Sequence, residues 1–317
     1  MPLPYALNHI NLWLIEDSKG WTVVDTGAQT PEAITAWRTL FSQSMAGRGV
    51  DRVIATHMHP DHIGLAGWLT RRFACPLWMT RGEYLTGRVL VADTGREAPD
   101  EAIRFYQSAG WDEEAIEDYR TRFGSFGKHV HALPESFRRI HDQERFMIGG
   151  HEWRVVVGNG HSPEHACLYC EGLGVLISGD QVLPRISSNV SVFPTEPEAD
   201  PLGDWLESLA KLAREVPDNV LVLPAHNEPF RGLHARLEQL RNGHQTALAR
   251  LKRSVQQPKR AVDVFAALFG RAIDKNGFLL NMATGESIAH LNRLLADGEV
   301  TRKADETGVF WYQNKEA

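Results

Sequence analysis

The feature that most constrains this chain is the run THMHPDH at residues 56–62, which follows the apolar stretch Val53–Ala55 directly. Three histidines and one aspartate fall within six residues where a strand is expected to end, so several side chains can point toward one spot. A turn at Pro60 would let His57 and His59 converge on one ion while Asp61 and His62 address a second. This spacing predicts a metal site rather than four structural side chains.

Two ions need more ligands than this cluster offers, so further ligands are expected at the ends of other strands. Three candidates follow short apolar runs. His161 follows Val155–Val157, Asp180 follows Val175–Ser178, and His226 follows Val220–Leu223. Side chains at the ends of neighbouring strands gather at one edge of a layered sheet. The sequence therefore predicts that these three side chains join the THMHPDH cluster.

The order of elements predicts a layered α/β domain with two additions. Strand-like runs alternate with turns and with a helix that begins after Thr30-Pro31, whose apolar residues share one face. The chain of 317 residues is expected to form a large domain over residues 1–232 and a smaller one over 233–317.

Residues 81–140 interrupt the alternation and are predicted to form a helical insertion. They are polar and contain two expected helices, Asp100–Ala109 and Asp112–Phe123. Such an insertion beside a metal site is a candidate lid, and a solvated surface addition is the alternative. Both interpretations stay open at this point.

The C-terminal residues are predicted to be helical and to end in a hairpin. We expect helices over Val262–Phe269 and Glu286–Ala296, then strands over Glu299–Arg302 and Val309–Tyr312. Residues 236–317 hold 13 Lys and Arg against 9 Asp and Glu, a charge of +4, which leaves −10 elsewhere in a chain of net charge −6. The predicted metal site thus lies in the acidic part.

Composition narrows the class of protein further. Hydrophobic residues make up 43% and charged residues 23%, as in globular domains. No apolar run approaches the roughly 20 residues of a membrane span, and the first residues lack a basic region before an apolar stretch, so we expect a cytoplasmic protein without a membrane partner. Three cysteines are too few for a disulfide framework. Cys167 and Cys170 read as residues of a strand, whose side chains face opposite sides rather than one zinc ion.

These motifs together resemble the metallo-β-lactamase superfamily. THMHPDH, GNGHSPEH, SGDQ and LPAH occur in the family's order between about Asn8 and Glu228. The resemblance implies a four-layer αββα sandwich and two divalent ions. It places His57, His59 and His161 on one ion, Asp61, His62 and His226 on the other, and Asp180 as the bridge. Asp25 of VVDTG matches a position that supports the metal loop without binding metal.

The bridging position separates branches of the superfamily. The β-lactamases of the family carry cysteine or serine there, so the aspartate at position 180 implies a hydrolase of another branch. In this respect the chain resembles the glyoxalase II-like thioesterases, the lactonases and the phosphodiesterase-nucleases, which share an aspartate at this position. The C-terminal helix and hairpin resemble the winged-helix domain of the β-lactamase-like endoribonucleases. Asn227 stands where many relatives have glycine.

Three other residues are candidates for supporting roles. Arg185, five residues after Asp180, offers a bidentate grip on a carboxylate or phosphate, or forms a surface salt bridge. His165 either supports a metal ligand or caps a turn. Asp61 is the candidate catalytic residue, because a carboxylate there can hold a metal-bridging hydroxide and pass its proton to the leaving group.

The leading hypothesis is a binuclear metal-dependent hydrolase that acts on a small thioester, ester or lactone. A phosphodiesterase or endoribonuclease is the alternative, favoured by the basic C-terminal residues and opposed by the acidic body. A third interpretation assigns the C-terminal domain to protein contact or regulation, and a homodimer is left open. Zinc is the first expectation for the metal, with manganese or iron as alternatives.

Overall fold

The computed structural model of the chain describes residues 1–4, 7–45, 47–273 and 277–316. They group into two units. The first consists of Met1–Gly95, Gly124–Ser188 and Lys211–Arg236, and the second of Arg96–Phe123, Asn189–Ala210 and Leu237–Ala317. The predicted insertion is thus divided, because its middle part groups with the C-terminal residues. That it acts as a lid stays a prediction, as does the domain boundary at residue 232.

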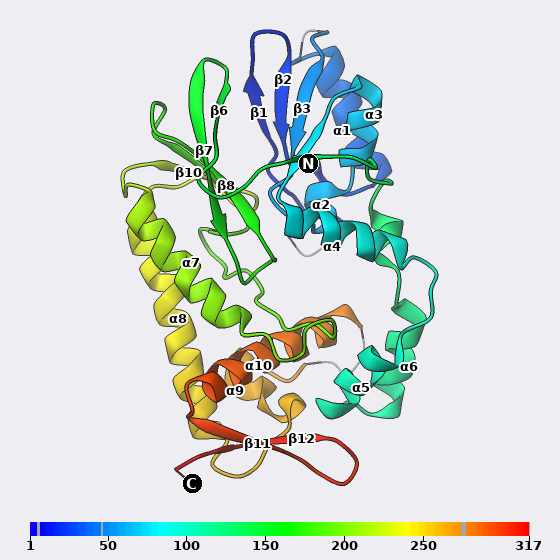
Figure 1. Cartoon of the computed structure of the whole chain (residues 1–317), viewed down its shortest axis with the longest axis vertical. Helices are drawn as coiled ribbons and strands as arrows, with labels where there is room; N and C mark the ends of the chain where they lie inside the picture. The colour runs from blue at the N-terminus through cyan, green and yellow to red at the C-terminus, as the bar shows by residue number, and fades with distance from the viewer. Residues whose placement is uncertain (5–6, 46, 274–276, 317) are drawn as a thin grey trace. The chain divides into compact units, whose positions relative to one another are not determined.

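The first sheet of the first unit is built from the N-terminal strands (Figure 1). Its order is β1 (Trp13–Glu16), β2 (Trp21–Val24), β3 (Val50–Ile54), β4 (Leu77–Met79) and β5 (Arg138–Arg139). Only β1 and β2 pair antiparallel, and the other pairs are parallel. The helices between these strands are α1 (Pro31–Ser42), α2 (Pro60–Ile63), α3 (Ala66–Phe73) and α4 (Arg81–Ala92).

The second sheet of the first unit is mostly antiparallel. Its order is β10 (Leu221–Pro224), β9 (Val175–Gly179), β8 (His165–Cys170), β7 (His151–Gly158) and β6 (Arg145–Ile148), and only β9 and β10 are parallel. Cys167 and Cys170 both lie on β8 as free, buried thiols. The prediction that these two cysteines lie on a strand is confirmed.

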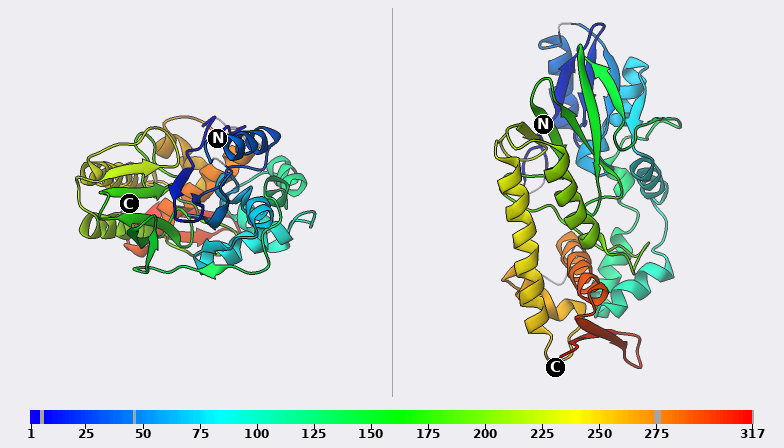
Figure 2. Two further views of the ribbon diagram at one scale, coloured as in Figure 1. Left: turned by 90° about the horizontal axis from the view of Figure 1, so that it is seen from above. Right: turned by 60° about the vertical axis from the view of Figure 1, so that its left-hand side comes forward.

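An apolar core joins the two sheets, and a second core covers the outer face of the first sheet. Val24 and Ile54 of the first sheet pack with Trp153, Val155 and Leu168 of the second. Figure 2 shows the blue and green strands of this unit side by side. On the outer face, α1 buries Trp37 completely. The predicted αββα sandwich is confirmed.

Local sequence explains where α1 begins, as predicted. The Thr30 side chain accepts a hydrogen bond from the Ala33 amide at 3.1 Å, and Pro31 occupies the first turn, where its missing N–H costs nothing. Inside the helix, Trp37 Nε1 donates to the Thr26 carbonyl at 2.8 Å. The helix is therefore fixed to the segment that follows β2.

The outer face of the second sheet is covered by the end of α7 (Pro201–Glu215), a helix whose first residues belong to the second unit. Lys211 Nζ donates to the Val157 carbonyl at 2.9 Å, and Arg154 pairs with Glu215 at 3.1 Å. These contacts hold the helix against β7.

The second unit is mainly helical. It contains α5 (Asp100–Ser108), α6 (Glu113–Arg122), most of α8 (Leu233–Ser254), α9 (Phe265–Phe269), α10 (Phe278–Ala296), β11 (Val300–Ala304) and β12 (Phe310–Asn314). Trp111 Nε1 donates to Thr284 Oγ1 of α10 at 2.9 Å, which ties the segment of α5 and α6 to α10.

The expected C-terminal hairpin is present, with Arg302 of β11 opposite Tyr312 of β12. The helix expected from Glu286 begins earlier, at Phe278, and the helix expected from Val262 begins only at Phe265, after a 3₁₀ turn. The winged-helix assignment stays a prediction. None of the helices within the described ranges combines the length and apolar character that crossing a bilayer requires.

Candidate metal centre

The THMHPDH run leaves the end of β3 and turns into α2. His59 has extended backbone angles, and Pro60 begins the helix with the φ that a first turn requires. The expected turn at Pro60 is therefore a short helix, which separates His57 and His59 from Asp61 and His62. Gly64 follows α2 where a Cβ atom would lie 2.4 Å from the Pro60 carbonyl oxygen. Only glycine fits there without a shift of the backbone.

The second sheet brings three more side chains to the same place. His161 follows β7, Asp180 follows β9 and His226 follows β10, as the sequence predicts. All three are buried. The structure thus brings together the seven residues predicted as ligands, four from the segment after β3 and three from the second sheet.

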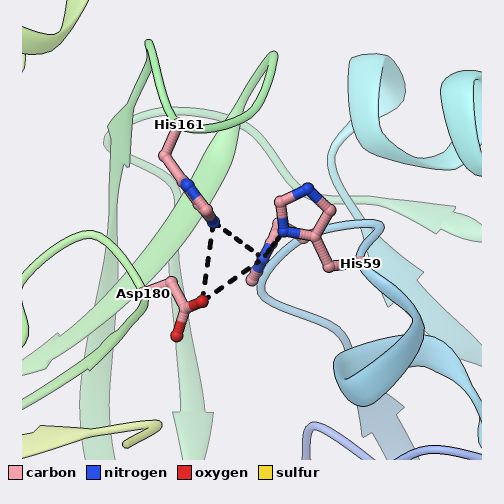
Figure 3. Close-up of side chains that lie close together, drawn as sticks. His59, His161 and Asp180 are labelled. Atoms are coloured by element: carbon pink, nitrogen blue, oxygen red, sulfur yellow. Dashed lines mark hydrogen bonds and ion pairs between the residues drawn. The ribbon is translucent and has the colours of Figure 1, made fainter. Parts of the chain in front are cut away.

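The first group of donors consists of His57, His59, His161 and Asp180, whose ligand atoms lie within 4.8 Å of one another. His57 Nε2 lies 2.8 Å from His59 Nδ1 and 3.3 Å from His161 Nε2. Asp180 Oδ2 lies 3.5 Å from His161 Nε2. Figure 3 shows His59, His161 and Asp180 directed toward one another.

The second group consists of Asp61, His62 and His226. Asp61 Oδ2 lies 3.4 Å from His226 Nε2 and 3.8 Å from His62 Nε2. The other oxygen of Asp180, Oδ1, lies 3.5 Å from His226 Nε2 and 3.6 Å from His62 Nε2. The Asp180 carboxylate therefore faces the first group with one oxygen and the second group with the other.

Hydrogen bonds at the far side of two rings fix their orientation. His62 Nδ1 lies 2.8 Å from Asp25 Oδ2, and His226 Nδ1 lies 3.0 Å from the His9 carbonyl oxygen. Both partners accept a hydrogen bond, so each Nδ1 carries the proton. Each Nε2 therefore faces Asp180, and in the neutral ring its lone pair would be available to a metal ion.

Asp25 itself has a left-handed backbone, with a φ of 60°. Its carboxylate accepts from the Thr56 amide at 2.8 Å and from the Thr56 hydroxyl at 2.9 Å in addition to His62. These contacts connect the end of β2 to the start of the THMHPDH run. Asp25 thus contacts this run from behind, in keeping with the supporting role that the family resemblance implies for it.

Electrostatics within the centre differ between the two groups. Burial, and after it the neighbouring histidines, lowers the pKa of His57 well below its ordinary value and that of His59 to about 3. Burial alone would also lower the pKa of His62, but the carboxylates of Asp25, Asp61 and Asp180 raise it well above that value. The carboxylates therefore favour positive charge beside His62, whereas His57 and His59 stay neutral.

Two buried atoms of the centre indicate that a cation fits there. Within the described residues, His62 Nε2 and Asp180 Oδ1 have no hydrogen-bond partner. They lie 3.6 Å from each other, too far for a hydrogen bond, and a buried polar atom without a hydrogen bond is costly. Imidazole and carboxylate donors suit zinc, manganese and iron. The residues present could therefore hold metal ions.

His165 lies behind Asp180 and does more than cap a turn. Its Nε2 accepts a hydrogen bond from the Asp180 amide at 3.1 Å, and burial lowers the pKa of His165 well below its ordinary value, so the ring is neutral. Gly179, with a φ of 50°, would place a Cβ atom 2.5 Å from this nitrogen. The neutral ring thus fixes the backbone that carries Asp180.

Glu83 on α4 is a residue of this region that the sequence did not single out. Its buried carboxylate accepts hydrogen bonds from residues beside His59 and His161. The pattern Thr80-Arg-Gly-Glu83 matches a capping box, in which threonine and glutamate would cap the helix locally. Thr80 makes no such cap bond, so this pattern conceals the contacts of Glu83.

Arg185 lies at the surface and pairs with Glu228, whose Oε1 is 2.8 Å from Arg185 Nε. The guanidinium is largely exposed, with a side-chain exposure of 69%. Its role as a substrate anchor stays a prediction. Asn227, next to His226, has a φ of 65°, a left-handed value that asparagine tolerates better than most other residues.

Two family descriptions match the chain. Residues 6–226 match the metallo-β-lactamase superfamily, and residues 248–315 match the metallo-β-lactamase-like C-terminal domain. A β-lactamase domain protein from Burkholderia ambifaria is 40% identical, with a TM-score of 0.89 over 99% of this chain and 90% of that one. A metallo-β-lactamase family protein from Thermus thermophilus is 29% identical, with a TM-score of 0.82 over 99% and 97%.

Curated relatives are more distant. The probable metallo-hydrolase YqjP of Bacillus subtilis is 25% identical over 98% of this chain and 95% of its own length. An atrochrysone carboxyl ACP thioesterase from Aspergillus fumigatus is 24% identical, but the match covers 74% of this chain and only 41% of that protein. The fold, the histidine and aspartate groups and these matches lead to one conclusion: the chain belongs to the metallo-β-lactamase superfamily and is a metal-dependent hydrolase.

Proposed function

We propose that this hydrolase uses two divalent ions and acts on a small thioester, ester or lactone. The position of Asp180 carries the proposal. Its Oδ2 lies 3.5 Å from His161 Nε2 and its Oδ1 lies 3.5 Å from His226 Nε2, so one carboxylate serves both groups of donors. His57, His59 and His161 would hold one ion, Asp61, His62 and His226 the other, with Asp180 as the bridge.

The charges of the region support two ions rather than one. Four carboxylates lie in or directly behind the centre, those of Asp25, Asp61, Glu83 and Asp180. When these are ionised and the histidines are neutral, their total charge is −4, which two divalent cations balance. Unbalanced buried charge is strongly disfavoured. We take zinc as the first expectation, with manganese or iron as alternatives.

When bound, such ions polarise the scissile carbonyl and lower the pKa of water toward about 7. Asp61 is the catalytic residue of this proposal. Burial would raise the pKa of Asp61, but the charge of His62 and the hydrogen bond with His226 lower it. Its carboxylate is therefore ionised while His62 is charged, and divalent cations beside it would have the same effect once His62 is neutral. Asp61 would then accept a proton from the attacking water and pass it to the leaving group.

Acyl substrates are favoured by the residue at the bridge and by one relative. An aspartate stands at position 180, where the β-lactamases of the family carry cysteine or serine, so we do not expect β-lactam hydrolysis. The Aspergillus fumigatus relative is named as a thioesterase. A thiolate is also a good leaving group, which needs little protonation by Asp61.

The test is hydrolysis by protein loaded with zinc, measured against a panel of substrates. The panel contains acyl thioesters, aryl esters, lactones, bis(p-nitrophenyl) phosphate and single-stranded RNA. We expect turnover of at least one acyl class and none of the phosphodiesters. RNA cleavage with inert acyl substrates would overturn the proposed substrate class and favour the nuclease alternative.

Asp180→Ala tests the two-ion centre independently of the substrate. We expect the bound zinc, measured by elemental mass spectrometry, to fall from two equivalents to one or less, and hydrolysis to fall at least 100-fold. Asp100→Asn, at an exposed position of α5, is the control. Two equivalents of zinc and full activity in the Asp180 variant would overturn the ligand assignment.

A further inference from the structure

The carboxylate of Glu83 joins two loops that are distant in sequence. Its Oε2 accepts from the Met58 amide at 2.9 Å, and its Oε1 accepts from the Ser162 hydroxyl at 2.6 Å and from the Glu164 amide at 2.8 Å. Met58 lies between His57 and His59, and Ser162 directly follows His161. One fully buried side chain therefore contacts both loops that carry the three histidines of the first group.

The start of α4 is attached to the second of these loops by two more bonds. Thr80 Oγ1 donates to the Glu164 carbonyl at 2.8 Å, and the Gly82 amide donates to a Glu164 carboxylate oxygen at 2.6 Å. The backbone that carries Glu83 and the loop that carries His161 thus hold each other in place.

The second group of donors does not depend on Glu83 in this way. His62 is oriented by Asp25, and His226 is oriented by the His9 carbonyl. Neither of these partners hydrogen-bonds Glu83 within the described part of the chain. Loss of the Glu83 carboxylate should therefore disturb the first group far more than the second.

Burial raises the pKa of Glu83, and the hydrogen bonds from Ser162, Glu164 and Met58 oppose this effect. No Lys or Arg in the described ranges forms an ion pair with it, although it is fully buried. Three donors satisfy its oxygens, and a cation held by the histidines of the two loops would balance its charge when Glu83 is ionised. This arrangement is expected of a residue that serves a cationic centre.

We propose that Glu83 is a positioning residue that holds His57, His59 and His161 in the geometry for the first ion. This inference rests on the proposed two-ion function. It assigns to α4 a role that differs from both a lid and a solvated addition, because the helix supports the ligands from behind.

Glutamine cannot replace Glu83 without loss, although its shape is almost the same. If the NH2 group of the glutamine faces the Met58 amide, two N–H donors point at each other. If it faces the loop after His161, it points at the Glu164 amide, which is also a donor. Either orientation leaves a buried N–H without an acceptor, so the two loops would move apart.

The experiment compares wild-type protein with Glu83→Gln, after removal of metal by chelation, in titrations with zinc against a competing chromophoric chelator. We expect the dissociation constant of one site to rise about 10- to 100-fold, as for other residues behind metal ligands, and that of the other site to change less than about threefold. Cobalt spectra of two further variants identify the weakened site, because His161→Ala keeps only the second group of donors intact and His226→Ala keeps only the first. The spectrum of Glu83→Gln with one equivalent should match that of His161→Ala.

Glu135→Gln is the matched control, because this glutamate is exposed and pairs only at the surface with Arg88. It should bind both ions like the wild type. Unchanged affinities in Glu83→Gln, or equal weakening of both sites, would overturn the proposal. If that variant does not fold, Ser162→Ala decides by the same criteria, with an expected loss of up to about tenfold at the first site. A wild-type protein that binds fewer than two ions would instead overturn the proposed function.

Discussion

The Nδ1 atom of His62 lies 2.8 Å from Oδ2 of Asp25, and this contact decides which nitrogen of His62 faces Asp180. The Asp25 carboxylate can only accept, so His62 must donate from Nδ1, and in the neutral ring the lone pair then lies on Nε2. The tautomer that a metal ion would require is thus favoured by Asp25, which is not one of the seven candidate ligands.

Asp25→Asn tests this relationship. Asparagine tolerates the left-handed backbone at this position, with its φ of 60°, and can still accept from the Thr56 amide. Its NH2 group would then face His62 Nδ1 and favour the wrong tautomer. We expect the affinity for the second ion to fall about 10- to 100-fold, measured by competition titration. Equal affinities in variant and wild type would contradict the assignment.

His165→Phe tests the support behind Asp180. The substitution keeps a ring but removes the acceptor of the Asp180 amide, which stays buried. We expect the free energy of unfolding to fall by about 1–3 kcal/mol, measured by denaturant titration, and kcat to fall because Asp180 moves. Unchanged values of both would show that this hydrogen bond contributes nothing.

Asn227 provides a test of backbone strain beside His226. Its φ of 65° suits glycine, and among the described residues its side-chain oxygen has no hydrogen-bond partner. Asn227→Gly should therefore leave the free energy of unfolding within about 0.5 kcal/mol of wild type, whereas Asn227→Ala should lower it by about 1–2 kcal/mol. Equal stability of the two variants would exclude strain as the reason for this residue.

Glu286 on α10 predicts a pH dependence in the second unit. Burial, opposed by a hydrogen bond from Asn189, raises the pKa of Glu286 from 4.5 to about 7. The folded protein therefore keeps a proton that the unfolded chain releases near pH 4.5, so this group makes the protein less stable as the pH rises from 4.5 through 7.

Glu286→Gln removes this titration. Between pH 4 and pH 8, the free energy of unfolding of the wild type should fall by roughly 2–3 kcal/mol relative to that of the variant. Denaturant titrations at several pH values measure it, with the exposed Glu306→Gln as control. A difference that does not change with pH would refute this role of the Glu286 proton.

The sequence predicts the donors of the metal centre because each one follows a strand. His161, Asp180 and His226 come directly after short apolar runs, and strand ends in a layered sheet meet at one edge. The structure brings them to the THMHPDH run as expected. Their assignment to individual ions depends on tautomers and distances that no sequence pattern contains.

Other features could not be predicted because the same local sequence pattern is compatible with more than one structure. Thr80 and Glu83 match a capping box, yet both side chains bond the loop after His161. The segment after β3 also forms the short helix α2, for which Pro60 signals only a change of direction. In the C-terminal region, α8 spans Leu233–Ser254, but mixed polar and apolar residues hide its bounds.

The seven residues of the candidate centre belong to neither sheet alone, since four follow β3 and three follow strands of the other sheet. His57 and His161, which meet at 3.3 Å, are 104 residues apart in the chain. Metal ions held there would act as cross-links between two halves of the sandwich, and such links resist the separation of distant segments. Removal of metal should therefore first loosen the docking of the two sheets, with faster amide hydrogen exchange along the Ile54 and Val155 strands before either sheet unfolds.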